Sequence, residues 1–198
     1  MSNRISLFVL LLGLSAATLQ ATGRQQTAPT DTFRVMVEES HLSLHTNLLR
    51  WATLTPDLGL EWRINPSWGI AVNGSWTSWS WNDKDRRYAL WEVMPEVRHY
   101  IGKEKRGYLG AMFKAGEFNY KLSDTGRQGD LMGGGLTGGY QLRLNKALAL
   151  DFNLGLGYLN ADYEKYEVIN GVRVRRGNET KDWWGPINAG VTLIWKLF

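Results

Sequence analysis

The sequence predicts an all-β fold, an eight-stranded antiparallel up-and-down β-barrel that crosses a membrane and is preceded by a signal peptide. From residue 41 onward, apolar and polar residues alternate with a period of two in segments of roughly 8 to 14 residues. Gly, Pro, Asn and Asp separate these segments. The apolar positions carry Leu, Val and Phe in the middle and aromatic residues toward the ends, among them Trp62, Trp68, Trp76, Tyr108, Tyr158 and Trp195. An apolar band between aromatic girdles is typical of a membrane barrel.

Eight segments follow this pattern, and each is expected to form a strand. The clearest is 147–160, where Leu148, Leu150 and Phe152 alternate with Ala149, Asp151 and Asn153. In chain order, the expected strands are 42–51, 57–64, 68–81, 88–100, 108–120, 131–144, 147–160 and 183–198.

The connections between the expected strands predict the topology. Those at 65–67, 102–106 and 145–146 are short, those at 123–130 and 164–181 are long, and the one near 53–56 is short. Short periplasmic turns and longer external loops are typical of bacterial outer-membrane barrels. We therefore expect an integral outer-membrane protein with both termini in the periplasm.

The first 40 residues are expected to lie outside the barrel. Residues 1–21 contain a basic Arg4, an apolar core at 5–14 and small residues from Ser15, which is the layout of a secretory signal peptide. Residues 22–40 form a polar segment, and 41–198 form the barrel. The chain has no cysteine, which excludes a lipidated cysteine, a disulfide and a thiol nucleophile.

Two prolines and five glycines fall inside expected strands. Pro95 and Pro186 each remove a hydrogen-bond donor, so we expect them at bulges or at the barrel rim. The glycines lack the strand–loop–helix context of a phosphate loop, and a curved barrel wall explains them better. They are Gly133, Gly134, Gly135, Gly138 and Gly139.

Charged residues on the polar faces predict an ionic network in the barrel interior. Glu61 and Arg63 lie on the polar face of the second expected strand, and Glu96 and Arg98 on that of the fourth. Ions in a narrow lumen are tolerated when they are paired and hydrogen-bonded. We therefore expect these four side chains to pair, with Asp151 as a further acceptor.

The longest connection, 164–181, predicts a hairpin above the membrane. Asn170 and Gly171 form a strong hairpin-turn signal between alternating flanks. We expect strands seven and eight to continue there as a two-stranded flap that displays a partner-binding surface for an acidic protein or lipopolysaccharide phosphates. Its expected residues are Val168, Asn170, Gly171, Arg173, Arg175 and Arg176.

The C-terminal strand resembles an assembly signal. A last strand ending in an aromatic residue, here with Trp195 and Phe198, is similar to the signal that the barrel-assembly machinery recognises in outer-membrane proteins. Phe198 is out of phase with the apolar face of Val191, Leu193 and Trp195, which is a departure from the usual signal.

Three longer runs extend the resemblance to a family. LSLHTNLLRWATLTPDLGLEWRI, EVMPEVRHYI and GNETKDWWGPINAGVTLIW together resemble an uncharacterised family of small outer-membrane β-barrels of Bacteroidota. The resemblance covers roughly residues 43–197. It implies a barrel that is often encoded beside fimbrial or other envelope genes, and it implies no catalytic residues.

Three functions remain open from the sequence. The first is a non-enzymatic structural or docking component of an envelope assembly, related to fimbriae or secretion, with no cofactor and no metal. Its expected partners are outer-membrane lipid and lipopolysaccharide, the assembly machinery, and a protein at the external loops or periplasmic face. The second is a barrel-type lipid-modifying enzyme, for which His45 beside Ser43 is the candidate; the other histidines are His41 and His99. The third is a small-solute channel or ligand-binding barrel, which a lumen filled by side chains disfavours.

The basic charge does not indicate a nucleic-acid partner. The formal net charge is +4, but the basic residues are scattered along the chain. The densest group, Arg173, Arg175 and Arg176, lies close in sequence to Glu164, Glu167 and Glu179. A nucleic-acid interface requires basic side chains clustered on one face.

Overall fold

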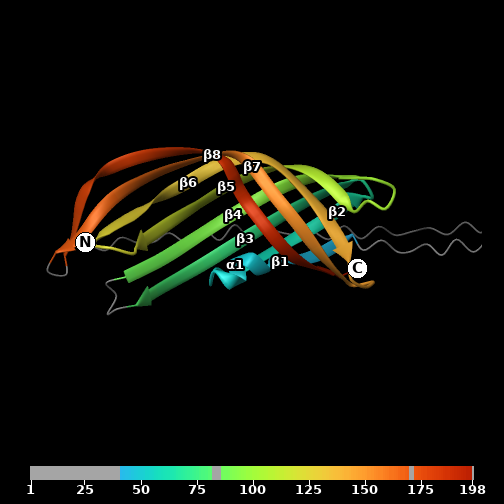
Figure 1. Cartoon of the computed structure of the whole chain (residues 1–198), viewed down its shortest axis with the longest axis horizontal. Helices are drawn as coiled ribbons and strands as arrows, with labels where there is room; N and C mark the ends of the chain where they lie inside the picture. Colours follow the sequence, from blue (N-terminus) through green and yellow to red (C-terminus); the bar gives the residue numbers. More distant parts are fainter. Residues whose placement is uncertain (1–40, 82–85, 170–171, 198) are drawn as a thin grey trace, which may run out of the picture. The chain divides into compact units, whose positions relative to one another are not determined.

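A computed structural model describes residues 41–81, 86–169 and 172–197, which form a ring of eight antiparallel strands (Figure 1). Each strand pairs with the next in sequence, and β1 pairs with β8 to close the ring, so the expected eight-stranded antiparallel barrel is confirmed. The expected signal peptide and the polar segment 22–40 lie outside the described residues. The elements are β1 (Leu42–Asn47), α1 (Leu48–Ala52), β2 (Asp57–Asn65), β3 (Trp68–Trp81), β4 (Arg86–Ile101), β5 (Gly107–Lys121), β6 (Thr125–Arg143), β7 (Leu148–Ile169) and β8 (Val172–Lys196).

The two faces of the wall are sorted in the opposite sense to a water-soluble barrel. On β2, Leu58, Leu60 and Trp62 point outward and are exposed, while Asp57 and Glu61 point inward and are buried. The same alternation runs through β3 and β4. The buried apolar cluster consists of Met94, Met112 and Ile187, with Leu159 packed against it. Most large apolar side chains of the described residues are therefore on the outside.

Tyr108 is an exception to the expected aromatic girdle. It lies on the inner face of β5 and is 2% exposed, so its expected place in the outer band is wrong. The reason is its phase, because Tyr108 alternates with Leu109, which is 61% exposed on the outside.

The first strand is shorter than expected. The prediction of a strand over 42–51 is wrong after Asn47, because residues 48–52 form the helix α1. Asn47 caps this helix: its side-chain oxygen accepts a hydrogen bond from Leu49 N at 3.1 Å. Asn47 N in turn donates to Asp57 Oδ1 at 2.9 Å, which fixes the start of α1 against the start of β2.

Strand β6 is longer than expected, and it joins the extension of β7 and β8. The predicted loop 123–130 is wrong, because β6 begins at Thr125 and its first residues pair with both neighbouring strands. The predicted continuation of strands seven and eight through 164–181 is confirmed: β7 runs to Ile169, β8 begins at Val172, and the two pair there. The flap is not two-stranded, since Thr125 on β6 lies opposite Glu167 on β7.

The two prolines interrupt the sheet in different ways. Pro186 lies at a register shift between β7 and β8, beside Gly185 with a φ of 148°. Pro95 lies within β4 opposite Val72, and the β4–β5 pairing skips Pro95 and its neighbour Met94. Pro186 is thus at a bulge, as predicted, whereas Pro95 is within a long strand.

The glycines of β6 allow a close approach of β7. Gly133 and Gly135 face inward, and a Cβ at either position would lie within about 2.2 Å of a backbone oxygen of β7. Both lie in the strand, as the prediction of a curved wall requires.

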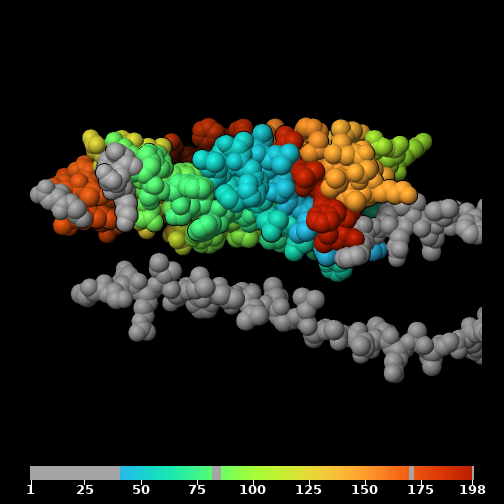
Figure 2. Space-filling view, turned by 90° about the horizontal axis from the view of Figure 1, so that it is seen from below, coloured from blue at the N-terminus to red at the C-terminus, as the bar shows by residue number. Residues whose placement is uncertain are grey.

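The ring has unequal height around its circumference. β1 and β2 end at α1, whereas β3 and β8 run on past it (Figure 1). Figure 2 shows the cyan surface of α1 and the start of β2 between the green surface of β3 and β4 and the red surface of β8. α1 contacts β8 there. No helix within the described residues is long and apolar enough to span a bilayer.

Candidate functional site: the charged interior and the outer sheet

Arg98 is the centre of a buried ionic network inside the ring. Its side chain extends inward from β4, where Arg98 Nη1 lies 3.1 Å from Glu61 Oε2 and 3.6 Å from Asp151 Oδ2. Arg98 Nη2 donates to Glu96 Oε2 at 2.7 Å. Arg63 lies at the edge of the cluster, with Nε 3.4 Å from Glu61 Oε1. The structure thus brings together all five residues for which the sequence predicts a lumen network.

Two tyrosines outside the predicted set also belong to this network. Tyr100 donates its hydroxyl hydrogen to Glu61, and Tyr108 donates to Asp151 at 2.9 Å. The guanidinium of Arg63 lies 3.6 Å from the centre of the Tyr100 ring, and that of Arg98 lies 4.5 Å from the centre of the Tyr108 ring. Both tyrosines occupy inward-facing positions of the alternating pattern, as Arg98 does, and this position is the sequence feature that identifies them.

A second group of paired charges lies beside the Arg98 network, toward the end of the ring where β6, β7 and β8 extend. The two groups are called the first and the second ionic layer below. Lys114 Nζ lies 3.5 Å from Glu92 Oε1 and donates to the carbonyl of Ile187 at 2.8 Å. Arg50 of α1 also pairs with Glu92. Because α1 was predicted as strand, the role of Arg50 could not be foreseen.

The interior between the two layers is nearly filled. A cavity of about 10 Å³ remains there, lined by nine residues: Asn47, Arg50, Asp57, Asn73, Met94, Arg98, Asn153, Asn188 and Thr192. This volume is about that of one water molecule. Arg98 Nε and Asp151 Oδ1 have no hydrogen-bond partner within the described residues. The cavity therefore has the size and the polar lining suited to a bound water.

Ser43 and His45 do not form a catalytic relay. Ser43 Oγ lies 3.1 Å from His45 Nε2, and Glu61 Oε2 lies 3.3 Å from the same nitrogen. In a relay the nucleophile and the acid contact different ring nitrogens. His45 Nδ1, the other nitrogen, has no partner in the described chain, and the His45 side chain is 1% exposed. A substrate could not reach this pair without opening the ring. His41 and His99 lie elsewhere, His41 at the start of β1 and His99 on the outer face of β4.

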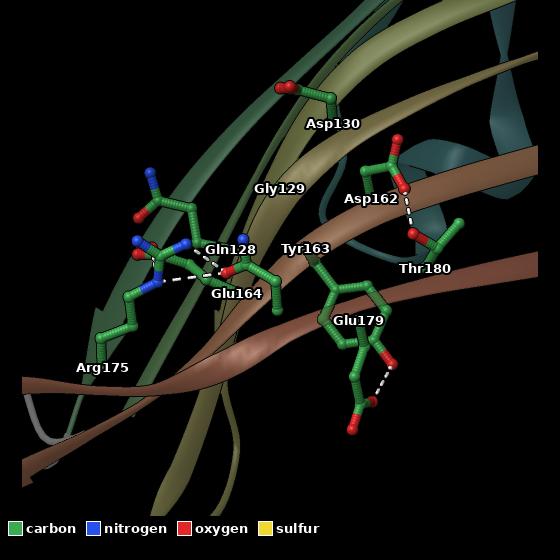
Figure 3. A pocket seen from close by; sticks show the side chains of 10 residues that line it. Gln128, Gly129, Asp130, Asp162, Tyr163, Glu164, Arg175, Glu179 and Thr180 are labelled. Carbon is green, nitrogen blue, oxygen red and sulfur yellow. Dashed lines mark hydrogen bonds and ion pairs between the residues drawn. The ribbon is translucent and has the colours of Figure 1, made fainter.

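The start of β6, the end of β7 and the start of β8 form a three-stranded part of the wall, called the outer sheet below. It has a shallow open pocket of about 460 Å³ (Figure 3). Its polar groups bind one another. Thr180 donates to Asp162 at 2.5 Å, and Tyr163 donates to Glu179 at 2.9 Å. Lys165 also donates to Glu179, and this bond, followed by that from Tyr163, holds the pKa of Glu179 below its ordinary value. Asp162 and Glu179 thus accept hydrogen bonds from neighbouring side chains within the sheet.

The three arginines predicted to bind a partner are paired within the sheet. Arg173 pairs with Glu164, donates to Gln128 at 2.7 Å, and stacks 3.9 Å from the centre of the Tyr166 ring. Arg176 donates to Glu167 at 2.7 Å, and Arg175 donates to Asn178 at 3.1 Å. Val168 lies opposite Arg173 in the β7–β8 pairing.

Some predicted positions lie outside the described residues. These are the turn residues Asn170 and Gly171 and the terminal Phe198 of the expected assembly signal. Trp195 is described: it points outward from β8 opposite Leu44 of β1 and is 54% exposed. Within the described residues no group of three or more acidic or histidine side chains has the geometry to hold a metal ion.

Comparison with known proteins gives one match. A family model described as a protein of unknown function (DUF3575) matches residues 14–197, which is nearly the whole chain. No curated protein and no solved structure matches it.

Proposed function

The chain belongs to the DUF3575 family, and we propose that it is an integral outer-membrane β-barrel with a closed lumen. Its proposed role is non-enzymatic, as a structural or docking component of a cell-envelope assembly. The observation that carries the proposal is the outward band of exposed apolar side chains around a buried ionic interior. In water this arrangement would expose a large apolar surface, whereas in a bilayer that surface is covered by lipid.

The height of the band supports a membrane-spanning wall. On β7 the outward residues from Leu148 to Tyr158 are apolar or aromatic, and the next ones, Asn160 and Asp162, are polar. On β8 the change comes at the same level, between Trp184 and Asp182. A membrane-spanning strand needs about 9–11 residues, which the stretch from Leu148 to Tyr158 supplies.

Side-chain and loop contacts pair a carbonyl on the exposed edge of β8 and an N–H group on that of β3 within this band. Asn47 Nδ2 donates to the carbonyl of Ala189 at 3.1 Å, and Pro186 has no N–H group. Trp76 N donates to the carbonyl of Pro56 at 3.1 Å. Backbone groups that face lipid must be paired, and these contacts supply pairs where β1 and β2 have ended.

The orientation follows from the two ends of the ring. The turns at 65–68, 101–107 and 143–148 lie at the end that carries residues 41 and 197. The opposite end carries the long polar parts of β6, β7 and β8. We place the first end in the periplasm and the second outside the cell, which matches the usual arrangement of such barrels.

The alternatives receive less support. A solute channel needs a passage, and the interior holds two ionic layers and a cavity of about 10 Å³. A lipid-modifying enzyme needs a reachable nucleophile, and Ser43 with His45 is buried inside the ring. The external sheet formed by 164–181 with β6 is the surface left for a docking role. Its partners would be lipopolysaccharide at the membrane surface and a protein of a fimbrial or secretion assembly, with the barrel-assembly machinery acting during insertion.

The proposal is tested by fractionation of a Gram-negative host that expresses the full chain. The protein should band with outer membranes on a density gradient and should resist extraction with alkaline carbonate. A soluble protein, or one released by carbonate, would contradict the proposal. Deletion of residues 1–21 is the matched control, since it should leave the protein in the cytoplasm if these residues direct export.

A further inference from the structure

The outer part of β8 has a strand partner on one side only. β8 pairs with β1 over Thr192–Lys196, because β1 ends at Asn47. From Val172 to Gly190, β8 pairs within the described residues with β7 alone. β3 also runs past the end of β2 on the other side of α1 (Figure 1). Between the outer parts of β8 and β3, the described residues therefore supply no continuation of β1 and β2.

The register identifies which backbone groups point to the open side. Lys196 N donates toward β7, to Ala147 O, whereas Leu197 N donates toward β1, to Leu42 O. Successive residues of a strand direct their N–H and C=O groups alternately to the two neighbouring strands. On β8, the residues whose side chains point outward therefore direct these groups toward the position of β1. Above the bulge at Pro186 these residues are Asn178, Thr180, Asp182 and Trp184.

The edge is capped near α1 and uncapped farther out. Asn47 caps the carbonyl of Ala189, and the indole of Trp183 donates to the carbonyl of Pro186 at 3.2 Å. In the described chain no comparable contact reaches the backbone of Thr180 or Asp182. An unpaired strand edge is a template for pairing with another chain. The uncapped part lies above the apolar band, where water or a partner can reach it.

Aromatic side chains line the inner side of the same opening. Trp79 and Trp81 lie on the inner face of β3, and each is 47% exposed. Trp183 lies on the inner face of β8, opposite Leu159, and is 50% exposed. Trp79 is held in place, since its indole donates to the carbonyl of Leu54 at 2.8 Å. A strand added to β8 would direct every second side chain to the face that carries Trp183.

We propose that Asn178–Trp184 of β8 binds an extended segment of a partner protein as an added antiparallel β-strand. This proposal rests on the docking role proposed above and names the chemistry of the partner. Main-chain hydrogen bonds to the edge supply affinity, and alternate side chains supply specificity. Cross-strand pairing favours an aromatic or apolar residue opposite Trp183, an acidic one opposite Lys181 and a basic one opposite Asp182.

The test uses the purified full chain in detergent and a synthetic peptide of this pattern. The probe is acetyl-Thr-Phe-Lys-Glu-Thr-Lys-Thr-amide with a fluorescent label, and binding is measured by fluorescence anisotropy. The decisive variant is Thr180→Pro, which removes an edge N–H and leaves the pairing with β7. Thr180→Ala is the matched control, because it loses the same hydrogen bond to Asp162 and keeps the N–H.

Wild type and Thr180→Ala should bind the peptide saturably, and Thr180→Pro should bind at least tenfold more weakly. A peptide N-methylated at its third and fifth amides should bind wild type at least tenfold more weakly, and this comparison needs no folded variant. The proposal is overturned if wild type does not bind, or if either change leaves binding unaltered. It is also overturned if wild type forms a homodimer that Thr180→Pro dissociates, because a second copy would then occupy the edge.

Failure of this proposal is separable from failure of the proposed function. If the protein fractionates with outer membranes but does not bind the peptide, the edge is not a docking site and the membrane assignment stands. If it binds the peptide but fractionates as a soluble protein, the membrane assignment fails and the edge site stands.

Discussion

Tyr108 on β5 lies directly opposite Gly139 on β6, and its ring occupies the space that a side chain at position 139 would need. A Cβ on Gly139 would lie 2.5 Å from the Tyr108 ring. The hydroxyl of the same ring donates to Asp151 at 2.9 Å. The absence of a side chain at position 139 therefore allows the interior network to form.

The first prediction is that Gly139→Ala destabilises the barrel. The added methyl displaces a ring that is 2% exposed and linked to Asp151, and overpacking of this kind costs about 1–3 kcal/mol. Gly138→Ala is the control: it faces outward, and its nearest neighbouring atom would be 3.6 Å away. Thermal unfolding in detergent should separate the two variants, and equal midpoints would contradict the role of Gly139.

The second prediction concerns Arg98. Arg98→Ala leaves Glu61, Glu96 and Asp151 without their shared cation, and breaking a buried pair costs about 3 kcal/mol. Arg143→Ala is the control, since Arg143 is exposed and donates to the carbonyl of Glu104. Chemical unfolding in detergent measures both. If Arg98→Ala unfolds at the same denaturant concentration as the parent, the network does not hold the wall together.

The third prediction distinguishes a lipid-covered wall from a water-covered one. Leu154 points outward from the middle of the band, opposite Gly138 and Ala189. Leu154→Arg should cost about 2–4 kcal/mol in a bilayer, measured by unfolding in lipid vesicles. Asp162→Arg, on the outer face beyond the band, is the comparison and should change stability much less. A protein whose outer face is in water would tolerate both substitutions.

The fourth prediction is topological. A protease-accessible tag in the β5–β6 turn at Asp124 should be cleaved on intact cells, and a tag between Asn145 and Lys146 should be protected. Asp124 lies in the turn that precedes Thr125, the first residue of β6. Cleavage of the second tag alone would reverse the orientation proposed for the barrel.

The fifth prediction separates the tip of the β7–β8 hairpin from its edge. Replacing 168–174 by a short Gly/Ser link removes Arg173 together with the tip, and leaves Thr180 and its free edge. The barrel should fold and unfold as the parent does, and peptide binding should persist, because the arginine contacts of the tip are internal to the sheet. Loss of the peptide with an unchanged barrel would move the docking site to the tip.

The period-two alternation was sufficient to predict the strands where one face meets the interior and the other the apolar band. It failed where strands leave that band. The pattern predicts a loop that includes Gln128 and Asp130, yet both residues pair on both sides within β6, and their side chains point outward. Outside a bilayer the outward face of a strand is polar, so the contrast on which the prediction depends disappears.

Neither the helix α1 nor the full set of residues in the interior network could be predicted from the sequence pattern alone. Asn47 caps α1 by accepting a hydrogen bond from Leu49 N, and Asn47 N donates to Asp57. The second contact joins two strands, so a local sequence pattern does not reveal it. The charged members of the network could be predicted because a narrow lumen leaves few partners. The tyrosines were harder to predict, since Tyr is as common at a membrane interface as in a polar interior.

The short first strand also determines where the ring is weakest. β1 meets β8 over five residue pairs, from Ser43 with Lys196 to Asn47 with Thr192, and these partners are far apart in sequence. β7 and β8 are joined by a turn and pair along most of their length. Contacts that close a long loop form late in folding. We therefore expect the seam between β1 and β8 to close late during assembly, and its backbone amides to exchange with solvent before those between β7 and β8.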